Sequence, residues 1–150
     1  MKKIILILIL VAAYSYFSQS PGILAKPAAE LANQSTQDAG DDRQLAAAFE
    51  QRQSNIQVEG HGTVSKLLPD DLDGSRHQKF IVQLATGQTI LVAHNIDLAP
   101  QIDGLSEGDQ ITFYGEYEWN QKGGIVHWTH HDPAGQHESG WIKHNDNIYR

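Results

Sequence analysis

The chain has 150 residues, contains no cysteine and carries a formal net charge of −7 with neutral histidines. This length fits a single domain, and the lack of cysteine excludes both a disulfide and an anchor attached through a lipid-modified cysteine. The few lysines and arginines are scattered along the sequence, so the composition disfavours binding to nucleic acid or to an anionic membrane surface.

The N-terminus has the features of a secretory signal. Lys2 and Lys3 precede an unbroken apolar run over residues 4–13. We expect residues 1–25 to be either removed as a signal peptide or kept as an N-terminal membrane anchor, because the run is short for a span and no clean Ala-x-Ala cleavage site follows. Both alternatives predict export, to the periplasm or to the periplasmic side of the inner membrane, with membrane contact only through this segment. Without it, nine basic residues remain against eighteen acidic ones, a net charge of −9.

Residues 26–54 are rich in Ala, Gln, Asn, Ser and Asp and poor in bulky apolar side chains. This composition predicts a flexible tether between the N-terminal segment and the folded domain. A short helix is expected at the end of the tether, over residues 42–53, with Asp41 or Asp42 as its N-cap.

The folded domain is expected over residues 55–150 and to consist mainly of β-strands. Alternating apolar and polar residues, separated by turn residues, predict five strands at 56–68, 78–84, 88–94, 110–119 and 125–130. A tail with a small final hairpin follows over residues 132–150. The long first strand, whose glycines favour a bend or a bulge, and the connector after the third strand indicate an all-β fold, a small five-stranded barrel of the OB type. An open β-sandwich or another small barrel is the alternative.

A turn at residues 86–87 is expected to join the second and third strands. If this turn has two residues, Lys79 lies opposite His94. The same register gathers three polar residues at one end of the barrel, near an acidic loop: His77, His94 and Asn95. It turns the following side chains towards the core: Phe80, Val82, Leu84, Leu91 and Ala93.

Histidine is concentrated near the C-terminus, where five of the eight histidines fall between residues 127 and 144. Imidazole and carboxylate are the usual ligands of Zn²⁺ and similar ions. The predicted metal ligands are His127, His130, His131 and Asp132, with His77 and His94 in support. On an unbroken strand His127 and His131 share one face with Thr129, and His130 points to the other, so a single site needs a strand break near His130. A structural polar network and plain surface exposure are the alternative roles.

Aromatic side chains offer a second kind of contact. Trp119 and Trp128 can stack on a ligand, as aromatic residues of OB-folds do, and Asn95 lies near the expected histidine cluster. The alternative is that most aromatic side chains fill the core of the small barrel. The sequence contains no Ser-His-Asp order, P-loop or dinucleotide-binding fingerprint.

Several short segments carry a resemblance to a known family. They are Leu68-Pro69-Asp70-Asp71, His77-Gln78-Lys79-Phe80, Ala93-His94-Asn95-Ile96, Gly115-Glu116-Tyr117-Glu118-Trp119, Gly123-Gly124, His127-Trp128-Thr129-His130 and Gly140-Trp141-Ile142. Through them, residues 56–149 resemble a family of short exported bacterial proteins of unknown function that carry an HWTH motif. The resemblance implies a self-standing exported domain and implies no activity.

Three functional hypotheses follow from the sequence. The first is an envelope-facing binding module whose His/Trp-rich end holds a small ligand or a divalent transition metal such as zinc. The second is a metal-assisted hydrolase of the nuclease or phosphoesterase type, with an open metal position for water. The third is a structural or interaction domain whose partner is another envelope protein.

Overall fold

The computed structural model describes residues 27–150, so the predicted signal peptide or anchor at 1–25 lies outside the described residues. Residues 33–150 belong to one compact unit. The elements of the described chain are α2 (Ala28–Glu50), β1 (Ile56–Leu67), β2 (His77–Leu84), β3 (Thr89–Asn95), β4 (Gln110–Glu118), β5 (Ile125–His127), β6 (Trp141–His144) and β7 (Asn147–Tyr149). Within residues 27–150, no helix combines the length and the apolar character that crossing a membrane requires.

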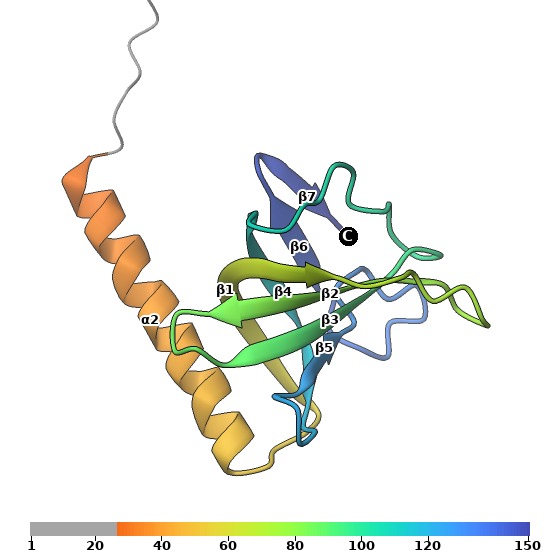
Figure 1. Ribbon diagram of the computed structural model, residues 1–150, viewed down its shortest axis with the longest axis horizontal. Helices are drawn as coiled ribbons and strands as arrows, with labels where there is room; N and C mark the ends of the chain where they lie inside the picture. Colours follow the sequence, from red (N-terminus) through yellow and green to blue (C-terminus); the bar gives the residue numbers. More distant parts are fainter. Residues whose placement is uncertain (1–26) are drawn as a thin grey trace, which may run out of the picture. The chain divides into compact units, whose positions relative to one another are not determined.

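Five strands close into a barrel in the order β1–β2–β3–β5–β4, and β4 pairs back onto β1 (Figure 1). Neighbouring strands are antiparallel except β3 and β5, which run parallel. The closed five-stranded order confirms the predicted small all-β barrel of the OB type.

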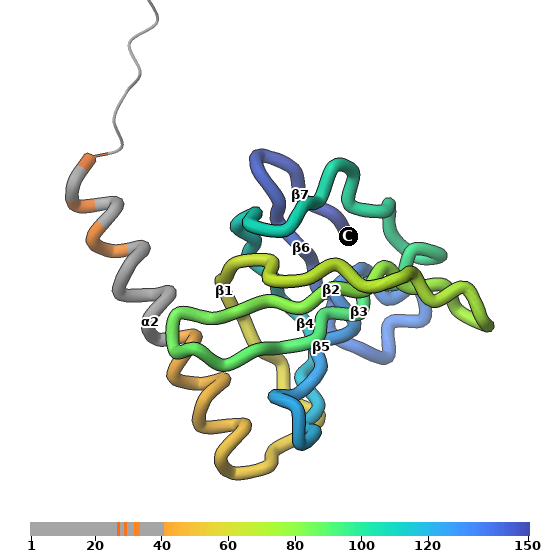
Figure 2. Tube along the Cα trace, in the orientation of Figure 1, coloured from red at the N-terminus to blue at the C-terminus, as the bar shows by residue number. Residues whose placement is uncertain are grey.

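The C-terminal strands β6 and β7 form a hairpin that extends the sheet from β4, in agreement with the hairpin expected near the C-terminus. Two strands, β5 and β6, therefore pair with the same edge of β4. β5 pairs with residues 116–118 of β4, and β6 pairs with residues 111–114. Between β5 and β6 the chain leaves the sheet as a loop over residues 128–140, called the 128–140 loop below (Figure 2).

The helix is longer than the sequence predicted. It covers Ala28–Glu50 instead of residues 42–53, so most of the segment expected to be a tether is helical. Ala, Leu, Gln and Glu have high intrinsic helix propensity, and the burial of Leu45 in the core stabilises the last turns, from which the helix extends backwards along the chain. Asp42 is not the N-cap, because it lies within the helix and its carboxylate accepts the Ala85 N–H of the β2–β3 turn at 3.1 Å.

The register between β2 and β3 differs by one residue from the prediction. Gly87, with a φ of 87°, ends a three-residue loop instead of lying in a two-residue turn. His94 is therefore opposite Gln78 and not opposite Lys79. Because side chains alternate between the two faces of a strand, this shift turns over the whole of β3. The side chains that point into the barrel are Ile90, Val92 and His94, whereas the outer face carries Leu91 and Ala93, which the prediction had placed in the core.

The hydrophobic core fills the barrel and includes side chains from the last turns of α2. Gly60 of β1 allows Leu45 of α2 to pack closely against the strand, because a side chain at this position would collide with Leu45 and with the ring of Phe113. The bulge that the sequence placed at the glycines of the first strand occurs further along β1. The pairing with β2 shifts between Val64 and Lys66, and a bulge of this kind bends and twists the strand.

Candidate functional site

The fifth strand ends earlier than predicted, which decides where the histidines lie. β5 stops at His127 instead of residue 130, because Trp128 adopts a positive φ of 52° and redirects the chain. The side-chain alternation of the strand therefore ends at His127. Thr129 and His131 do not share the face of His127: Thr129 is buried inside the protein, and His131 is exposed. The strand break that a single site required thus occurs two residues before His130.

His94 lies inside the barrel and is fully buried. Its Nδ1 is 2.8 Å from Thr129 Oγ1, and its Nε2 is 3.2 Å from the Pro100 carbonyl oxygen. Burial lowers the pKa of His94 to about 4, so the ring is neutral near pH 7. A neutral ring has one donor and one acceptor, and the carbonyl requires the donor at Nε2. Both ring nitrogens are therefore used within the protein.

Asp132 organises the 128–140 loop. Its carboxylate is buried and accepts the backbone N–H groups of Ala134, Gln136 and His137 at 2.9, 2.7 and 2.8 Å. Hydrogen bonds to the charged form, first those from Ala134 and His137, lower the pKa of Asp132 to about 2. His130, also buried, points its Nδ1 at the His131 carbonyl oxygen, 2.8 Å away. These predicted metal ligands thus have polar partners within the loop.

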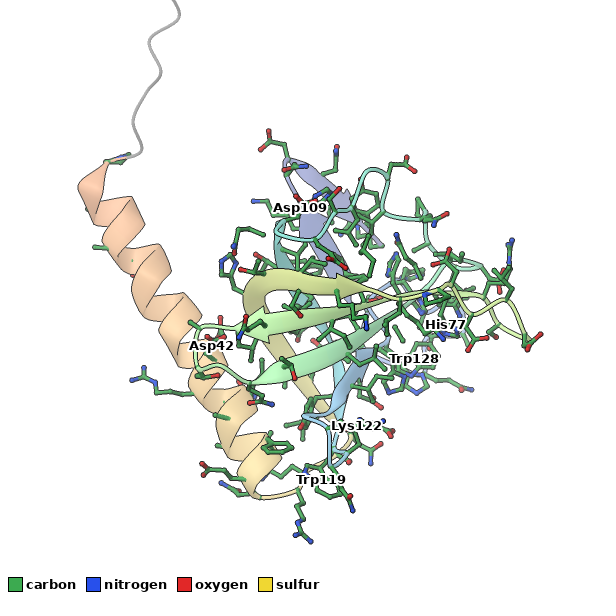
Figure 3. The ribbon with its side chains drawn as sticks, in the orientation of Figure 1. Asp42, His77, Asp109, Trp119, Lys122 and Trp128 are labelled. Atoms are coloured by element: carbon green, nitrogen blue, oxygen red, sulfur yellow. The ribbon has the colours of Figure 1, made fainter. Side chains whose placement is uncertain are left out.

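The predicted ligand-contacting residues fall into different places. Trp128 stacks on the His137 ring, with centroids 3.7 Å apart. Trp119 packs against the core near the β4–β5 turn, where the Arg52 guanidinium lies 5.2 Å from its ring, and Figure 3 shows it well away from Trp128. Asn95 pairs with His77 across β2 and β3 and accepts the Asp97 N–H at 2.9 Å. The structure does not bring the two tryptophans together.

The outer face of the barrel carries a cleft of about 290 Å³, called the outer cleft below. It is lined by Asp71, His77, Lys79, Leu91, Ala93, Glu118, Ile125 and His127. These residues come from four of the five barrel strands and from the loop before β2. In Figure 3, the labelled His77 and Trp128 lie on the same side of the barrel. Of the predicted metal ligands, His77 and His127 meet at this cleft.

Two glutamates accompany His127 at the edge of the outer cleft. The β4–β5 register pairs Glu116 with His127, and Glu118 follows on the same face of β4. His127 Nε2 lies 3.6 Å from Glu116 Oε1 and 3.8 Å from Glu118 Oε1. One ligand atom from each of the three residues lies within 4.8 Å of the others. Glu116, Glu118 and His127 are called the acid–histidine triad below.

The environment of His127 favours a neutral imidazole. Burial is the main cause of a lowered pKa of His127, and the neighbouring histidines His137 and His77 act in the same direction. The carboxylates of Glu116 and Glu118 oppose this shift. His127 Nε2 is itself buried and has no hydrogen-bond partner among the described residues.

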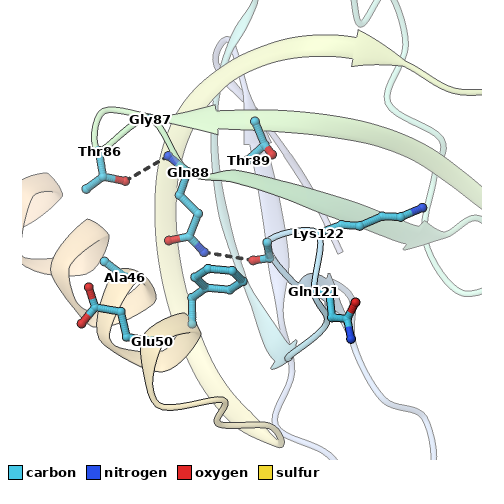
Figure 4. A pocket seen from close by; sticks show the side chains of 10 residues that line it. Ala46, Glu50, Thr86, Gly87, Gln88, Thr89, Gln121 and Lys122 are labelled. Atoms are coloured by element: carbon cyan, nitrogen blue, oxygen red, sulfur yellow. Dashed lines mark hydrogen bonds between the residues drawn. The ribbon is translucent and has the colours of Figure 1, made fainter.

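A larger hollow, of about 440 Å³, lies between the end of α2 and the β2–β3 and β4–β5 turns (Figure 4). Its lining, as far as the structure describes the chain, includes the charged residues Glu50 and Lys122 and no histidine. The Gln88 side chain at its wall already donates to the Gly123 carbonyl oxygen at 2.9 Å. The outer cleft, with two histidines and three charged residues, is therefore the better candidate for chemistry.

The site predicted from the sequence did not include Glu116 and Glu118. A usable signal existed. The short turn over residues 121–124 makes β4 and β5 a hairpin, and a hairpin with Glu118 opposite Ile125 brings Glu116 opposite His127. Lys79 was missed for another reason, because the one-residue error in the β2–β3 register placed its neighbours Leu91 and Ala93 in the core.

The chain belongs to the family described as "Protein of unknown function (DUF3465)", whose model matches residues 28–150. The match includes α2 and every strand of the barrel. No curated protein matches the chain.

Proposed function

We propose that this protein is an exported binding module that holds a small ligand in the outer cleft. The observation that carries the proposal is the lining of the cleft, in which charged and imidazole groups surround an apolar floor from β3 and β5. His77 and Lys79 of β2 offer hydrogen bonds on one side, and His127 and Glu118 offer them on the other. A few converging polar groups over an apolar surface are the usual composition of a small-ligand site.

The size and charge of the cleft restrict the ligand. A volume of about 290 Å³ is at the lower end of small-molecule sites and suits a molecule of the size of an amino acid or a monosaccharide. The Lys79 ammonium is 3.5 Å from the Asp71 carboxylate, so the cleft presents both charges side by side. We therefore expect a neutral polar or zwitterionic ligand. A polyanion such as nucleic acid is disfavoured by the acidic net charge.

The position of the cleft agrees with the proposal. OB-type barrels hold their ligands on the outer face of the second and third strands, between the loops that flank this face. The outer cleft lies on β2 and β3 and extends to β5. This agreement concerns location alone, because the same fold serves many functions.

Export rests on the sequence. The basic residues Lys2 and Lys3 and the apolar run over 4–13 have the form of a secretory signal. The binding module would then meet its ligand in the cell envelope, either free in the periplasm or held at the membrane by residues 1–25.

The test is ligand-observed NMR on the purified full chain with a mixture of amino acids and monosaccharides. Ala93→Phe fills the floor of the cleft, and Ile148→Phe adds the same ring at an exposed position on β7 as the matched control. We expect saturation transfer to at least one compound in the wild type and in Ile148→Phe, and its loss in Ala93→Phe. Binding that survives in Ala93→Phe, with the fold intact by circular dichroism, would place the ligand elsewhere and overturn the proposal. Transfer to none of the compounds in the wild type would overturn the predicted ligand class.

A further inference from the structure

The acid–histidine triad has the ligand set of a transition-metal site. Imidazole nitrogen and carboxylate oxygen both bind Zn²⁺ at about 2.0–2.2 Å, and sites with three protein ligands keep a further position open. Glu116 and Glu118 project from the same face of β4, and His127 projects beside them from β5. Because all three belong to paired strands of the closed barrel, their positions are set by the sheet.

The distances within the triad fit a shared ion better than hydrogen bonds. His127 Nε2 is 3.6 and 3.8 Å from the two carboxylate oxygens, which is too long for an N–H···O hydrogen bond. Two ligand atoms that each lie about 2.1 Å from a tetrahedral ion are about 3.4 Å apart. The observed separations need to shrink by only a few tenths of an ångström to meet this spacing.

Unused polar atoms mark the same place. Within the described part of the chain, His127 Nε2 is buried without a hydrogen-bond partner. So is Gln57 Nε2 of β1, on the other side of Glu116 in the same cross-strand row. A buried polar atom without a partner costs about 1–3 kcal/mol. An ion on Nε2 would satisfy the histidine, and the Gln57 amide is placed to support the Glu116 carboxylate, as outer partners of metal ligands do.

The charge of the triad also calls for a cation. Glu116 and Glu118 are partly buried, with side chains 20% and 45% exposed. Among residues 27–150, His127 is the only ion-pair partner that either carboxylate has. Two carboxylates and one imidazole thus converge on one point of the sheet face, which is the mixed oxygen and nitrogen set that a divalent transition metal binds.

We propose that Glu116, Glu118 and His127 bind one divalent transition-metal ion of the Zn²⁺ class at the edge of the outer cleft. Glu118 and His127 both line the cleft, so the open position of the ion faces the space where the small ligand of the proposed function would lie. The metal site does not require that ligand, and small-molecule binding does not require the metal. The set overlaps the metal site predicted from the sequence in His127 alone, with Glu116 and Glu118 in place of the residues of the 128–140 loop.

The experiment is isothermal titration of Zn²⁺ into the metal-free full chain, purified without a histidine tag. We expect one equivalent to bind. Glu116→Gln, Glu118→Gln and His127→Gln are each expected to weaken binding at least about 10-fold, because even the loss of an outer partner of a metal ligand costs about 10–100-fold. His131→Gln and Glu138→Gln change an exposed histidine and a glutamate of the 128–140 loop, and we expect them to bind as the wild type does. Circular dichroism checks the fold of every variant.

A second measurement uses Co²⁺ as a spectroscopic probe of the wild type. Four-coordinate Co²⁺ absorbs visible light strongly, and Zn²⁺ should displace it and abolish the band. The proposal is overturned if the wild type binds no Zn²⁺, or if His131→Gln lowers the affinity as much as His127→Gln does. A wild-type protein that binds a small molecule in the cleft but no Zn²⁺ would reject the metal site and leave the proposed function standing. A wild-type protein that binds Zn²⁺ but no small molecule would reject the proposed function alone.

Discussion

His94 and Thr129 meet inside the barrel, where a hydrogen bond of 2.8 Å joins β3 to the chain just after β5. The two residues are 35 positions apart in the sequence and both are fully buried. This bond fixes the point at which the 128–140 loop begins. It therefore supports the outer cleft from the inside, because His127 is two residues before Thr129.

Removing the Thr129 hydroxyl should destabilise the protein. Thr129→Val keeps the shape of the side chain and leaves His94 Nδ1 buried without a partner, which costs about 1–3 kcal/mol of unfolding free energy. The matched control is Thr112→Val, which breaks a hydrogen bond of 3.3 Å to His61 on the outside of the barrel. Water can replace the lost partner there, so the control should cost less than about 0.5 kcal/mol. Urea denaturation of both variants measures the difference, and equal losses would contradict the role of the buried pair.

Stability should fall as the pH drops from about 6.5 to about 4. Burial lowers the pKa of His94 from the ordinary 6.5 to about 4; the hydrogen bond to the Pro100 carbonyl opposes this shift, and His130 and His77 add to it. Between these pH values the unfolded chain binds a proton that the folded chain excludes. The neutral ring makes its full contribution to the free energy of unfolding above about pH 6.5. Near pH 4 the free energy of unfolding is lower by about 3 kcal/mol.

Urea denaturation at pH 7 and at about pH 4.5 tests this dependence, with His94→Gln as the comparison. Other histidines and the carboxylates also titrate in this range, so the informative quantity is the difference between the two proteins. The wild type should lose more stability than His94→Gln over the same interval. Parallel losses in the two proteins would show that His94 is not the source.

Asp132→Asn should loosen the 128–140 loop. The carboxylate accepts three backbone N–H groups, and an amide replaces one oxygen with a donor that repels them. We expect faster hydrogen exchange at the amides of Ala134, Gln136 and His137, and a change in tryptophan emission as Trp128 loses its stack with His137. Because the pKa of Asp132 is lowered from 3.8 to about 2, the stabilisation by the charged carboxylate is complete above about pH 3.8 and is lost as the pH falls towards 2. Unchanged exchange in Asp132→Asn would argue against this role.

Gly115→Ala should disturb the place where β5 ends. An added Cβ would lie 2.5 Å from the His127 carbonyl oxygen and 2.9 Å from Thr129 Cγ2, and a backbone oxygen cannot move aside as a side chain can. Overpacking of this kind costs about 1–3 kcal/mol. Gly135→Ala is the control, because that glycine has a φ of 66° with open space around it and pays only the backbone cost of about 1 kcal/mol. The thermal midpoint should be highest for the wild type, lower for Gly135→Ala and lowest for Gly115→Ala. A Gly115→Ala protein as stable as Gly135→Ala would contradict the close approach.

The N-terminal segment should direct export. Cell fractionation of the untagged full chain is expected to place the protein in the periplasmic or the membrane fraction, and deletion of residues 2–25 to retain it in the cytoplasm. The mass of the mature chain separates the two alternatives that the sequence leaves open. A chain shortened near residue 25 indicates a cleaved signal peptide, and a full-length chain in the membrane fraction indicates an anchor. Cytoplasmic full-length protein would reject both.

The sequence by itself determined the fold class. Alternating residues and turn signals mark each barrel strand, and these local patterns hold because every strand has one buried and one exposed face. The strand that became β4 shows this clearly, since Phe113 and Tyr117 are fully buried and Glu116 and Glu118 lie outside, as the alternation indicates. The final hairpin followed from the same kind of pattern.

The tertiary structure alone decided which face of β3 lines the outer cleft and where the residues after His127 lie. Two small backbone events, a three-residue loop ending at Gly87 and the positive φ of Trp128, reassigned the faces of β3 and of the chain after His127. Neither event has a strong local signal, because a two-residue and a three-residue loop can carry the same Thr-Gly pair and a tryptophan has no intrinsic preference for a positive φ. A shift of one residue moves a side chain from the core to the surface. For that reason His94 became part of the core, whereas the place of His127 beside Glu116 and Glu118 follows from the register of the β4–β5 hairpin.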